Sequence, residues 1–280
     1  MIEAAAPLGI LAGGGELPRR VAQAVASAGR PVRVVAIGGF ATPEDFTPHP
    51  SVAIRFGRAA RMLDWLRAEG VRQVVMAGTV TRPSMLSLMP DAATLKLVAR
   101  IGRAAFSGDD SILQAVVRVL REDGFEVLGA DALIAGLTPQ AGLLAGAPPD
   151  AEAMADIGRG FAVAAALGVL DVGQAVVVQQ GLVLGVEAIE GTDALLARVG
   201  PLRRDGPGGV LVKRVKPGQS RLVDLPTIGP RTVAGAATAG LRGLAIEANG
   251  TIVMERAATI AAVEAAGLFL LAIDPNDHDR

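Results

Sequence analysis

The segment 209–232 carries the densest set of residues that could do polar chemistry. It contains two of the chain's three lysines, Lys213 and Lys216, beside Arg214 and Arg221. Almost all other basic residues of the chain are arginines, so a lysine at a given position suggests a site that requires a compact point charge. A phosphate group suits such a charge, so we expect an anion near this segment.

Asp224 is the only acid in the same segment. A carboxylate among cations stays ionised. It can then hold Mg²⁺ or orient a water molecule. The alternative is an exposed ion pair with no part in chemistry.

A second group of polar residues lies in the stretch Glu187-Ala188-Ile189-Glu190-Gly191-Thr192-Asp193. Thr192 can cap a helix that begins there, but a cap explains only part of the pattern. Glu187 lies inside an apolar run, and a buried carboxylate needs a partner such as a cation. These features favour a functional site.

Three consecutive glycines, Gly13 to Gly15, separate an apolar run from a helical pattern. Backbone N–H groups at a helix N-terminus favour an anion. A phosphate, ribose or base could lie over this turn, or the turn could be purely structural. Thr79 and Arg82, after a later strand, could meet a phosphate at the same edge of a parallel sheet; the alternative there is a loop with a solvated arginine.

Two adjacent acids, Asp109 and Asp110, precede a further helical pattern. An acid at this position usually caps the helix. Two neighbouring carboxylates could also hold Mg²⁺.

Predicted strands and helices that would position these residues alternate along the chain. We expect strands at 8–12, 32–37, 51–56, 71–75, 125–128, 175–179, 182–188, 209–215, 244–246, 251–253 and 269–273. Helical patterns lie between most of them, which indicates an α/β fold. We predict an N-terminal Rossmann-like domain with a parallel sheet over 1–137, a linker over 138–150 and a mixed α/β domain over 151–280.

Composition narrows the chemistry further. The 280-residue chain has a formal net charge of −1, no cysteine and two histidines, His49 and His278. Disulfides, zinc–thiolate sites, Fe–S clusters and cysteine nucleophiles are therefore excluded. Carboxylates, cationic side chains, hydroxyls and backbone N–H groups remain, and this set suits Mg²⁺ and phosphate. The charge balance gives no sign of a nucleic-acid partner.

No basic leader and no long apolar segment stand out in the sequence. We therefore expect a cytoplasmic protein, with a peripheral contact on the inner face of the inner membrane left open. A homodimer is the default expectation for its assembly.

Taken together, these motifs resemble the UDP-2,3-diacylglucosamine pyrophosphatases of the LpxI type, from bacterial lipid A biosynthesis. The ordered set spans residues 12 to 229, so the resemblance covers essentially the whole chain. The matching pieces are Ala12-Gly13-Gly14-Gly15-x-Leu17-Pro18, Ala77-Gly78-x-Val80-x-Arg82-Pro83, Gly108-Asp109-Asp110, the stretch Glu187 to Asp193, and Lys213 through Lys216-Pro217 to Asp224-Leu225-Pro226-Thr227-Ile228-Gly229.

The resemblance implies a two-domain enzyme with its active site between the domains. It implies Mg²⁺-dependent hydrolysis of the pyrophosphate in UDP-2,3-diacylglucosamine, with UMP and 2,3-diacylglucosamine 1-phosphate (lipid X) as products. Water is expected to attack the phosphorus on the sugar side. Asp224 sits where the family's essential aspartate is expected.

Combining the residues with the resemblance gives each candidate a hypothetical role. The glycine turn would contact the nucleotide or diphosphate, while Lys213 and Arg82 would neutralise phosphoryl oxygens. The catalytic candidates are Asp224 and Lys213; the metal-ligand candidates are Asp224, Glu187 and Asp193. The substrate-binding candidates are Gly13, Gly14, Gly15, Thr79, Arg82, Glu190, Gly191, Thr192, Lys216 and Thr227.

Two other classes of protein stay open. One is a nucleotide-sugar or lipid-carrier binding protein without turnover. The other is an NAD(P)-dependent oxidoreductase. Its fingerprint G-x-G-x-x-G would need a third glycine where Pro18 stands, and an acid where the second strand ends in Gly38 and Gly39.

Overall fold

A computed structural model of the chain describes residues 5–80, 91–101, 109–217, 222–223 and 225–275. These residues form two compact units that divide between Ala135 and Gly136. Each unit has its own main sheet. Asp224, Arg82 and His278 lie outside the described residues.

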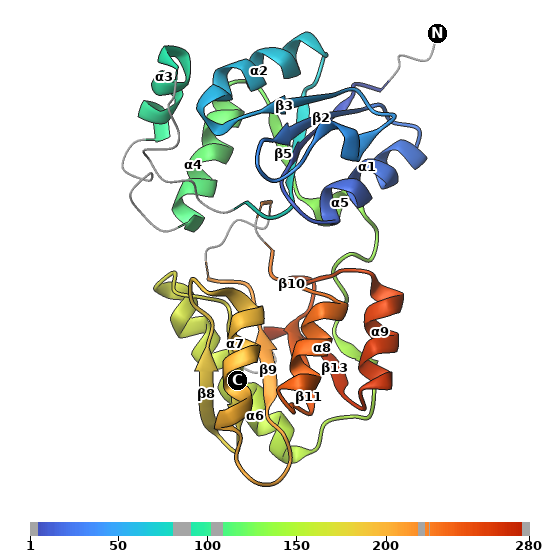
Figure 1. The fold of residues 1–280 in the computed structure, drawn as a ribbon, viewed down its shortest axis with the longest axis vertical. Coiled ribbons are helices and arrows are strands. Elements are labelled where there is room, and N and C mark those ends of the chain that lie inside the picture. Colours follow the sequence, from blue (N-terminus) through green and yellow to red (C-terminus); the bar gives the residue numbers. More distant parts are fainter. Residues whose placement is uncertain (1–4, 81–90, 102–108, 218–221, 224, 276–280) are drawn as a thin grey trace. The chain divides into compact units, whose positions relative to one another are not determined.

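The N-terminal domain contains a five-stranded parallel sheet in the order β3-β2-β1-β4-β5. This strand order is that of a Rossmann half with a continuation beyond β4 (Figure 1). Its elements are β1 (Leu8–Ala12), α1 (Leu17–Ser27), β2 (Val32–Ile37), β3 (Ser51–Ile54), α2 (Ala59–Ala68), β4 (Gln73–Ala77), α3 (Ala92–Ile101), α4 (Asp109–Glu122), β5 (Glu126–Leu128) and α5 (Ala130–Leu133), with short 3₁₀ turns at Pro43–Phe46 and Phe56–Arg58.

Burial explains the strand sequences of this domain. All five residues of β1 are buried, and β2 is buried except for Arg33 and Ile37. Strands covered on both faces need continuous apolar runs and not alternation. Leu222 and Val223, from the second half of the chain, also pack against the core of this domain.

The C-terminal domain contains a six-stranded sheet in the order β6-β13-β11-β9-β7-β8. The three central strands β9, β11 and β13 are parallel, and the outer pairings are antiparallel. Its elements are β6 (Gly142–Ala145), α6 (Ala151–Val169), β7 (Ala175–Gln179), β8 (Leu182–Val186), α7 (Gly191–Val199), β9 (Val210–Lys213), β10 (Thr227–Ile228), α8 (Pro230–Thr238), β11 (Gly243–Glu247), β12 (Ile252–Val253), α9 (Arg256–Ala265) and β13 (Phe269–Ile273), with a 3₁₀ turn at Gly200–Leu202.

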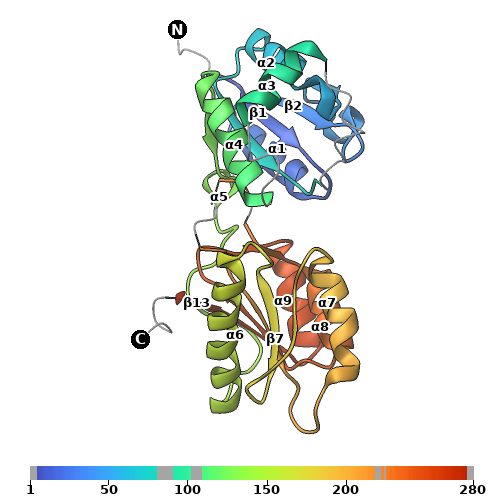
Figure 2. The ribbon, with the colours of Figure 1, turned by 90° about the vertical axis from the view of Figure 1, so that its left-hand side faces the viewer.

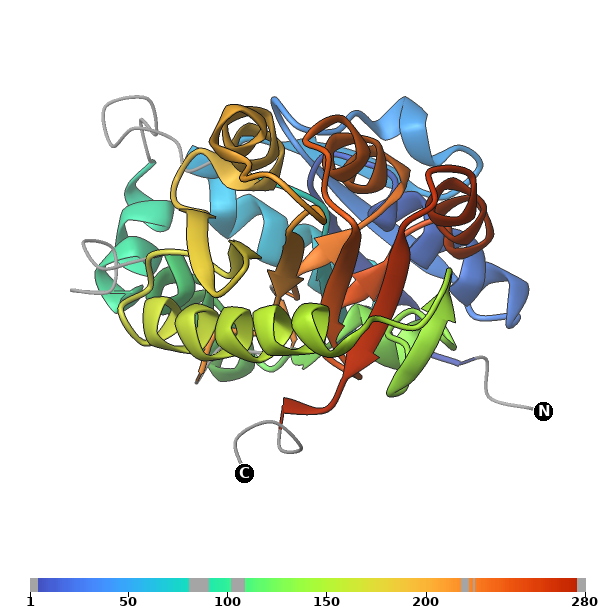
Figure 3. The same cartoon turned by 90° about the horizontal axis from the view of Figure 1, so that it is seen from below.

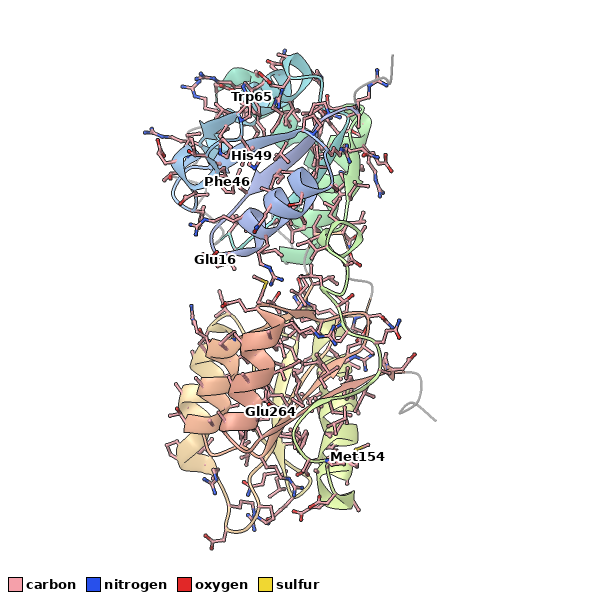
Figure 4. The ribbon with its side chains drawn as sticks, turned by 90° about the vertical axis from the view of Figure 1, so that its right-hand side faces the viewer. Glu16, Phe46, His49, Trp65, Met154 and Glu264 are labelled. Atoms are coloured by element: carbon pink, nitrogen blue, oxygen red, sulfur yellow. The ribbon has the colours of Figure 1, made fainter. Side chains whose placement is uncertain are left out.

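Helices cover both faces of this second sheet. Helix α6 lies on one face, and α7, α8 and α9 lie on the other (Figures 2 and 3). Met154 on α6 and Glu264 on α9 mark the two layers in Figure 4. Successive side chains of a strand point to opposite faces of the sheet. In β9, Val210 and Val212 therefore pack with α6, whereas Leu211 packs with the layer of three helices.

One prediction about domain organisation is corrected. Gly142–Ala145 lie inside the expected linker 138–150, but they form strand β6, which pairs antiparallel with β13. The Gly- and Pro-rich surroundings hid this strand, because its pairing depends on residues more than a hundred positions later. The predicted α/β class with two domains is confirmed. No helix in the described part of the chain has the length and apolar character to cross a membrane.

In the N-terminal domain, the loop after β1 and the loop after β4 cross in close contact, and this crossing allows a prediction about stability. Gly78 has φ of +93°, and a Cβ there would lie 2.6 Å from the carbonyl oxygen of Gly14. We expect Gly78→Ala to lower the free energy of unfolding of this domain by at least about 2 kcal/mol. Denaturant unfolding followed by the fluorescence of Trp65, the single tryptophan, measures it.

Gly29→Ala is the matched control for that variant. Gly29 also has a positive φ of +78°, but no atom lies within 4 Å of its built Cβ. Its expected cost is about 1 kcal/mol, from the left-handed backbone alone. Equal costs for the two variants would show that the loop crossing does not require a glycine.

Candidate active site

The glycine turn of the N-terminal domain is tied to the loop after β4. The N–H of Gly13 donates to Ala77 O at 2.8 Å, and the N–H of Gly14 donates to Thr79 O at 2.8 Å. Thr79 N–H in turn donates to Gly14 O at 2.9 Å. The structure therefore brings Gly14 and Thr79 together, as the carboxyl ends of neighbouring parallel strands should.

These hydrogen bonds alter the expected role of the turn. The first two glycine N–H groups bind protein carbonyls, so a phosphate cannot use them while the loop crossing is intact. Gly15, with φ of +91° and open space around its Cβ position, is the glycine that remains at the start of α1. A ligand at this turn would have to meet Gly15 and the N-terminus of α1.

For three other candidates in this domain, the structure describes no side chain. Arg82 lies outside the described residues. Asp109 and Asp110 begin α4, and their side chains are likewise not described. His49 lies in this domain beside Phe46 (Figure 4), and the backbone N–H of His49 donates to Phe46 O at 2.8 Å.

The C-terminal domain brings four of the predicted residues into contact, and we call Glu187, Thr192, Lys213 and the carbonyl of Thr227 the lysine cluster. Lys213 Nζ donates to Thr192 Oγ1 at 2.7 Å and to Thr227 O at 3.2 Å. Thr192 Oγ1 donates in turn to Glu187 Oε1. The ammonium nitrogen lies 4.0 Å from that carboxylate oxygen.

Four different elements position this cluster. Lys213 ends β9, where it pairs with Ile246 of the parallel strand β11. Glu187 follows β8, Thr192 lies in the first turn of α7, and Thr227 begins β10. The cluster thus forms at the carboxyl ends of the parallel strands, which is where open α/β sheets bind ligands.

The cluster is buried. Lys213 is 5% exposed and Glu187 is 6% exposed. Isolated charges at this depth are costly, so they persist when paired and hydrogen-bonded. The expectation that a cation compensates Glu187 is confirmed, and Lys213 is that cation.

Two further ion pairs are made by cationic residues that follow Lys213 in the sequence. Arg214 Nε lies 3.7 Å from Glu247 Oε2, and that oxygen accepts the N–H of Val215 at 3.1 Å. Lys216 Nζ donates to Asp171 Oδ1 at 2.6 Å. Sequence reasoning missed Glu247, although the signal was the same as for Glu187: an acid at the end of an apolar strand.

Two of the three acids expected to bind metal, Glu187 and Asp193, face protein cations, and the third, Asp224, lies outside the described residues. Glu187 Oε1 faces Thr192 and Lys213, and Glu187 Oε2 accepts the N–H of Gln174 at 3.3 Å. Asp193 is exposed and pairs with Arg231. No described group of three acidic or histidine side chains could hold an ion.

Glu190 is also compensated by a cation. Its carboxylate accepts from Arg198 Nη2 at 2.7 Å, and this hydrogen bond is the main cause that lowers the pKa of Glu190 below its usual value. Gly191, with φ of +79°, starts α7 directly before Thr192. The loop between β8 and α7 therefore combines a surface ion pair with the buried cluster.

The fold and this site define a two-domain α/β protein that gathers buried, oppositely charged side chains at the carboxyl ends of parallel strands. Comparison with known families then identifies it: the chain belongs to the LpxI family. The model of the LpxI N-terminal domain matches residues 7–137, and the model of the LpxI C-terminal domain matches residues 140–271.

Comparison with individual proteins agrees with this assignment. A protein of Caulobacter vibrioides named UDP-2,3-diacylglucosamine pyrophosphatase LpxI is 43% identical over 277 residues, which cover 97% of this chain and 99% of the relative. Among solved structures, glycinamide-RNase-transformylase T from Mycobacterium tuberculosis matches 65% of this chain and 44% of its own at 15% identity, with a TM-score of 0.25. A TM-score that low does not indicate a shared fold.

Proposed function

We propose that the chain hydrolyses the pyrophosphate bond of UDP-2,3-diacylglucosamine in lipid A biosynthesis, and that it releases UMP and 2,3-diacylglucosamine 1-phosphate (lipid X). The observation that carries the proposal is the 43% identity with the Caulobacter pyrophosphatase over nearly the full length of both chains. Family membership of both domains supports it.

The lysine cluster gives this activity a physical basis. Phosphoryl transfer depends mostly on positioning and on stabilisation of developing negative charge. The ammonium of Lys213 is buried and held by Thr192 and Thr227. A fixed cation in a low-dielectric environment stabilises phosphoryl charge more strongly than a solvated one.

A requirement for Mg²⁺ belongs to the same proposal. Glu187 and Asp193 already face protein cations, so Asp224 is the predicted ligand that remains, together with oxygens of the substrate itself. The ion would supply neutralisation of charge on the diphosphate. In the proposed reaction, water attacks the sugar-side phosphorus and the bond from that phosphorus to the bridging oxygen breaks. UMP leaves with the bridging oxygen, and the water oxygen stays in lipid X.

A mass-spectrometric assay tests these statements together. Purified protein is incubated with UDP-2,3-diacylglucosamine in ¹⁸O-labelled water, with Mg²⁺ or with EDTA. We expect UMP and lipid X only with Mg²⁺, and the label only in lipid X. Label in UMP would overturn the proposed site of attack. Tight binding of substrate without any product would favour a carrier protein instead.

A further inference from the structure

The hydroxyl of Thr192 lies between two buried charges. It accepts a hydrogen bond from Lys213 Nζ at 2.7 Å and donates one to Glu187 Oε1. A hydroxyl can do both at once, because it has one donor and two acceptor sites. The ammonium and the carboxylate are thereby coupled through Thr192 and remain 4.0 Å apart.

The carboxylate end of this arrangement is itself fixed by the backbone. Glu187 Oε2 accepts the N–H of Gln174 at 3.3 Å, and Glu187 N–H donates to Ala175 O at 2.8 Å. A Cβ on Gly173 would lie 1.9 Å from the carbonyl oxygen of Glu187, so the two segments pack in direct contact. Glu187, directly after β8, is therefore held against the start of β7 before any ligand binds.

We propose that Glu187 and Thr192 are positioning residues: together they hold the ammonium of Lys213 charged and in one orientation at the carboxyl ends of the strands. This inference rests on the proposed function, and it replaces the expectation that Glu187 binds metal and Thr192 binds substrate. The carboxylate supplies the compensating charge, and the hydroxyl sets direction and distance.

This arrangement differs from an ion pair that only stabilises the fold. A direct pair would place the carboxylate against the ammonium at hydrogen-bond distance, with two groups sufficient for stability. Here a third group with two fixed hydrogen bonds intervenes. These two linked hydrogen bonds fix the position and orientation of the ammonium. Loss of that geometry lowers the rate of the reaction more than the affinity for the substrate.

Three variants test the inference. Glu187→Gln removes the charge, Thr192→Val removes the hydroxyl at constant shape, and Thr192→Ser keeps the hydroxyl. We expect the first two to lower kcat by about 10- to 100-fold with KM within about threefold of wild type. Thr192→Ser should restore kcat to within about threefold. Thr238→Val, on the exposed surface of α8, is the matched control with no expected effect.

A second readout does not depend on turnover. The chain has three lysines, and Lys96 is exposed, so it serves as an internal reference. The protein is labelled with an amine-reactive acylating reagent, and peptides are quantified by mass spectrometry. We expect the ratio of Lys213 to Lys96 labelling to rise at least about tenfold in Thr192→Val and Glu187→Gln. A side chain released from these hydrogen bonds reaches the reagent more often as the neutral amine, which is the form that is acylated.

The outcomes separate this inference from the proposed function. If the wild-type protein makes no product, the proposed hydrolase function is wrong. The labelling ratios still test whether Glu187 and Thr192 position Lys213. A labelling ratio unchanged in both folded variants would overturn the positioning role. Unchanged kcat, or a loss in Thr192→Ser as large as in Thr192→Val, would also overturn it. Far-UV circular dichroism identifies any variant that fails to fold, and the other variant then decides.

Discussion

Asp224→Asn is expected to lower the rate of pyrophosphate hydrolysis by about 10²- to 10³-fold. Asparagine keeps the shape of the side chain but loses the charge that could hold a cation or orient a water molecule. Asp224 is the only acid between residues 209 and 232, which also contain Lys213, Lys216 and Arg221.

The measurement is the initial rate of lipid X formation at saturating substrate. Asp205→Asn is the control, since Asp205 is exposed in the loop before β9 and keeps its backbone contact with Gln180. Activity of Asp224→Asn within tenfold of wild type would show that this aspartate does not carry the reaction. A loss in both variants would point to a general effect of removing an acid from the chain.

How far the sequence predicts the fold depends on what stabilises each element. Leu8–Ala12, Val32–Ile37, Ala175–Gln179 and Phe269–Ile273 were predicted with the bounds that the structure shows. Each is a mostly apolar run in a sheet covered on both faces, so burial and sequence pattern coincide. β10 has only two residues, and its pairing with β12 is a tertiary contact that no local pattern reveals.

The same distinction applies to the site. Burial of Glu187 was inferred from its apolar neighbours, and so was the need for a cation. The identity of that cation depended on the sheet order, which places β9 between β7 and β11. Asp171 was missed because it follows α6 in a turn with no apolar pattern around it.

At the glycine turn, the sequence left a ligand site and a structural turn open as alternatives. Three consecutive glycines predicted backbone N–H groups available to an anion. The structure shows that Gly13 is required by a crossing with the loop at Gly78 and Thr79, about 65 residues later, since a Cβ on Gly13 would lie 2.7 Å from Thr79 O. Local sequence reveals that a glycine is needed, but a ligand and a neighbouring backbone can both be the reason.

Lys213→Met is the second variant with a large expected effect. It removes the buried cation and keeps an apolar side chain of similar length in β9. We expect kcat to fall at least about 100-fold, because the fixed positive charge for phosphoryl oxygens is lost. We also expect the free energy of unfolding to fall by about 3–5 kcal/mol, since Glu187 then remains buried without its cation.

The double variant Lys213→Met/Glu187→Gln separates these two effects. Removing both charges takes away the uncompensated carboxylate, so most of the lost stability should return, since apolar or neutral replacement of a buried pair is often close to neutral. Activity should not return, because no ammonium is restored. Denaturant unfolding, with hydrogen exchange of the β9 and β11 amides to localise the change, measures stability; product formation measures activity. Recovery of activity in the double variant would mean that Lys213 serves the reaction only by compensating Glu187.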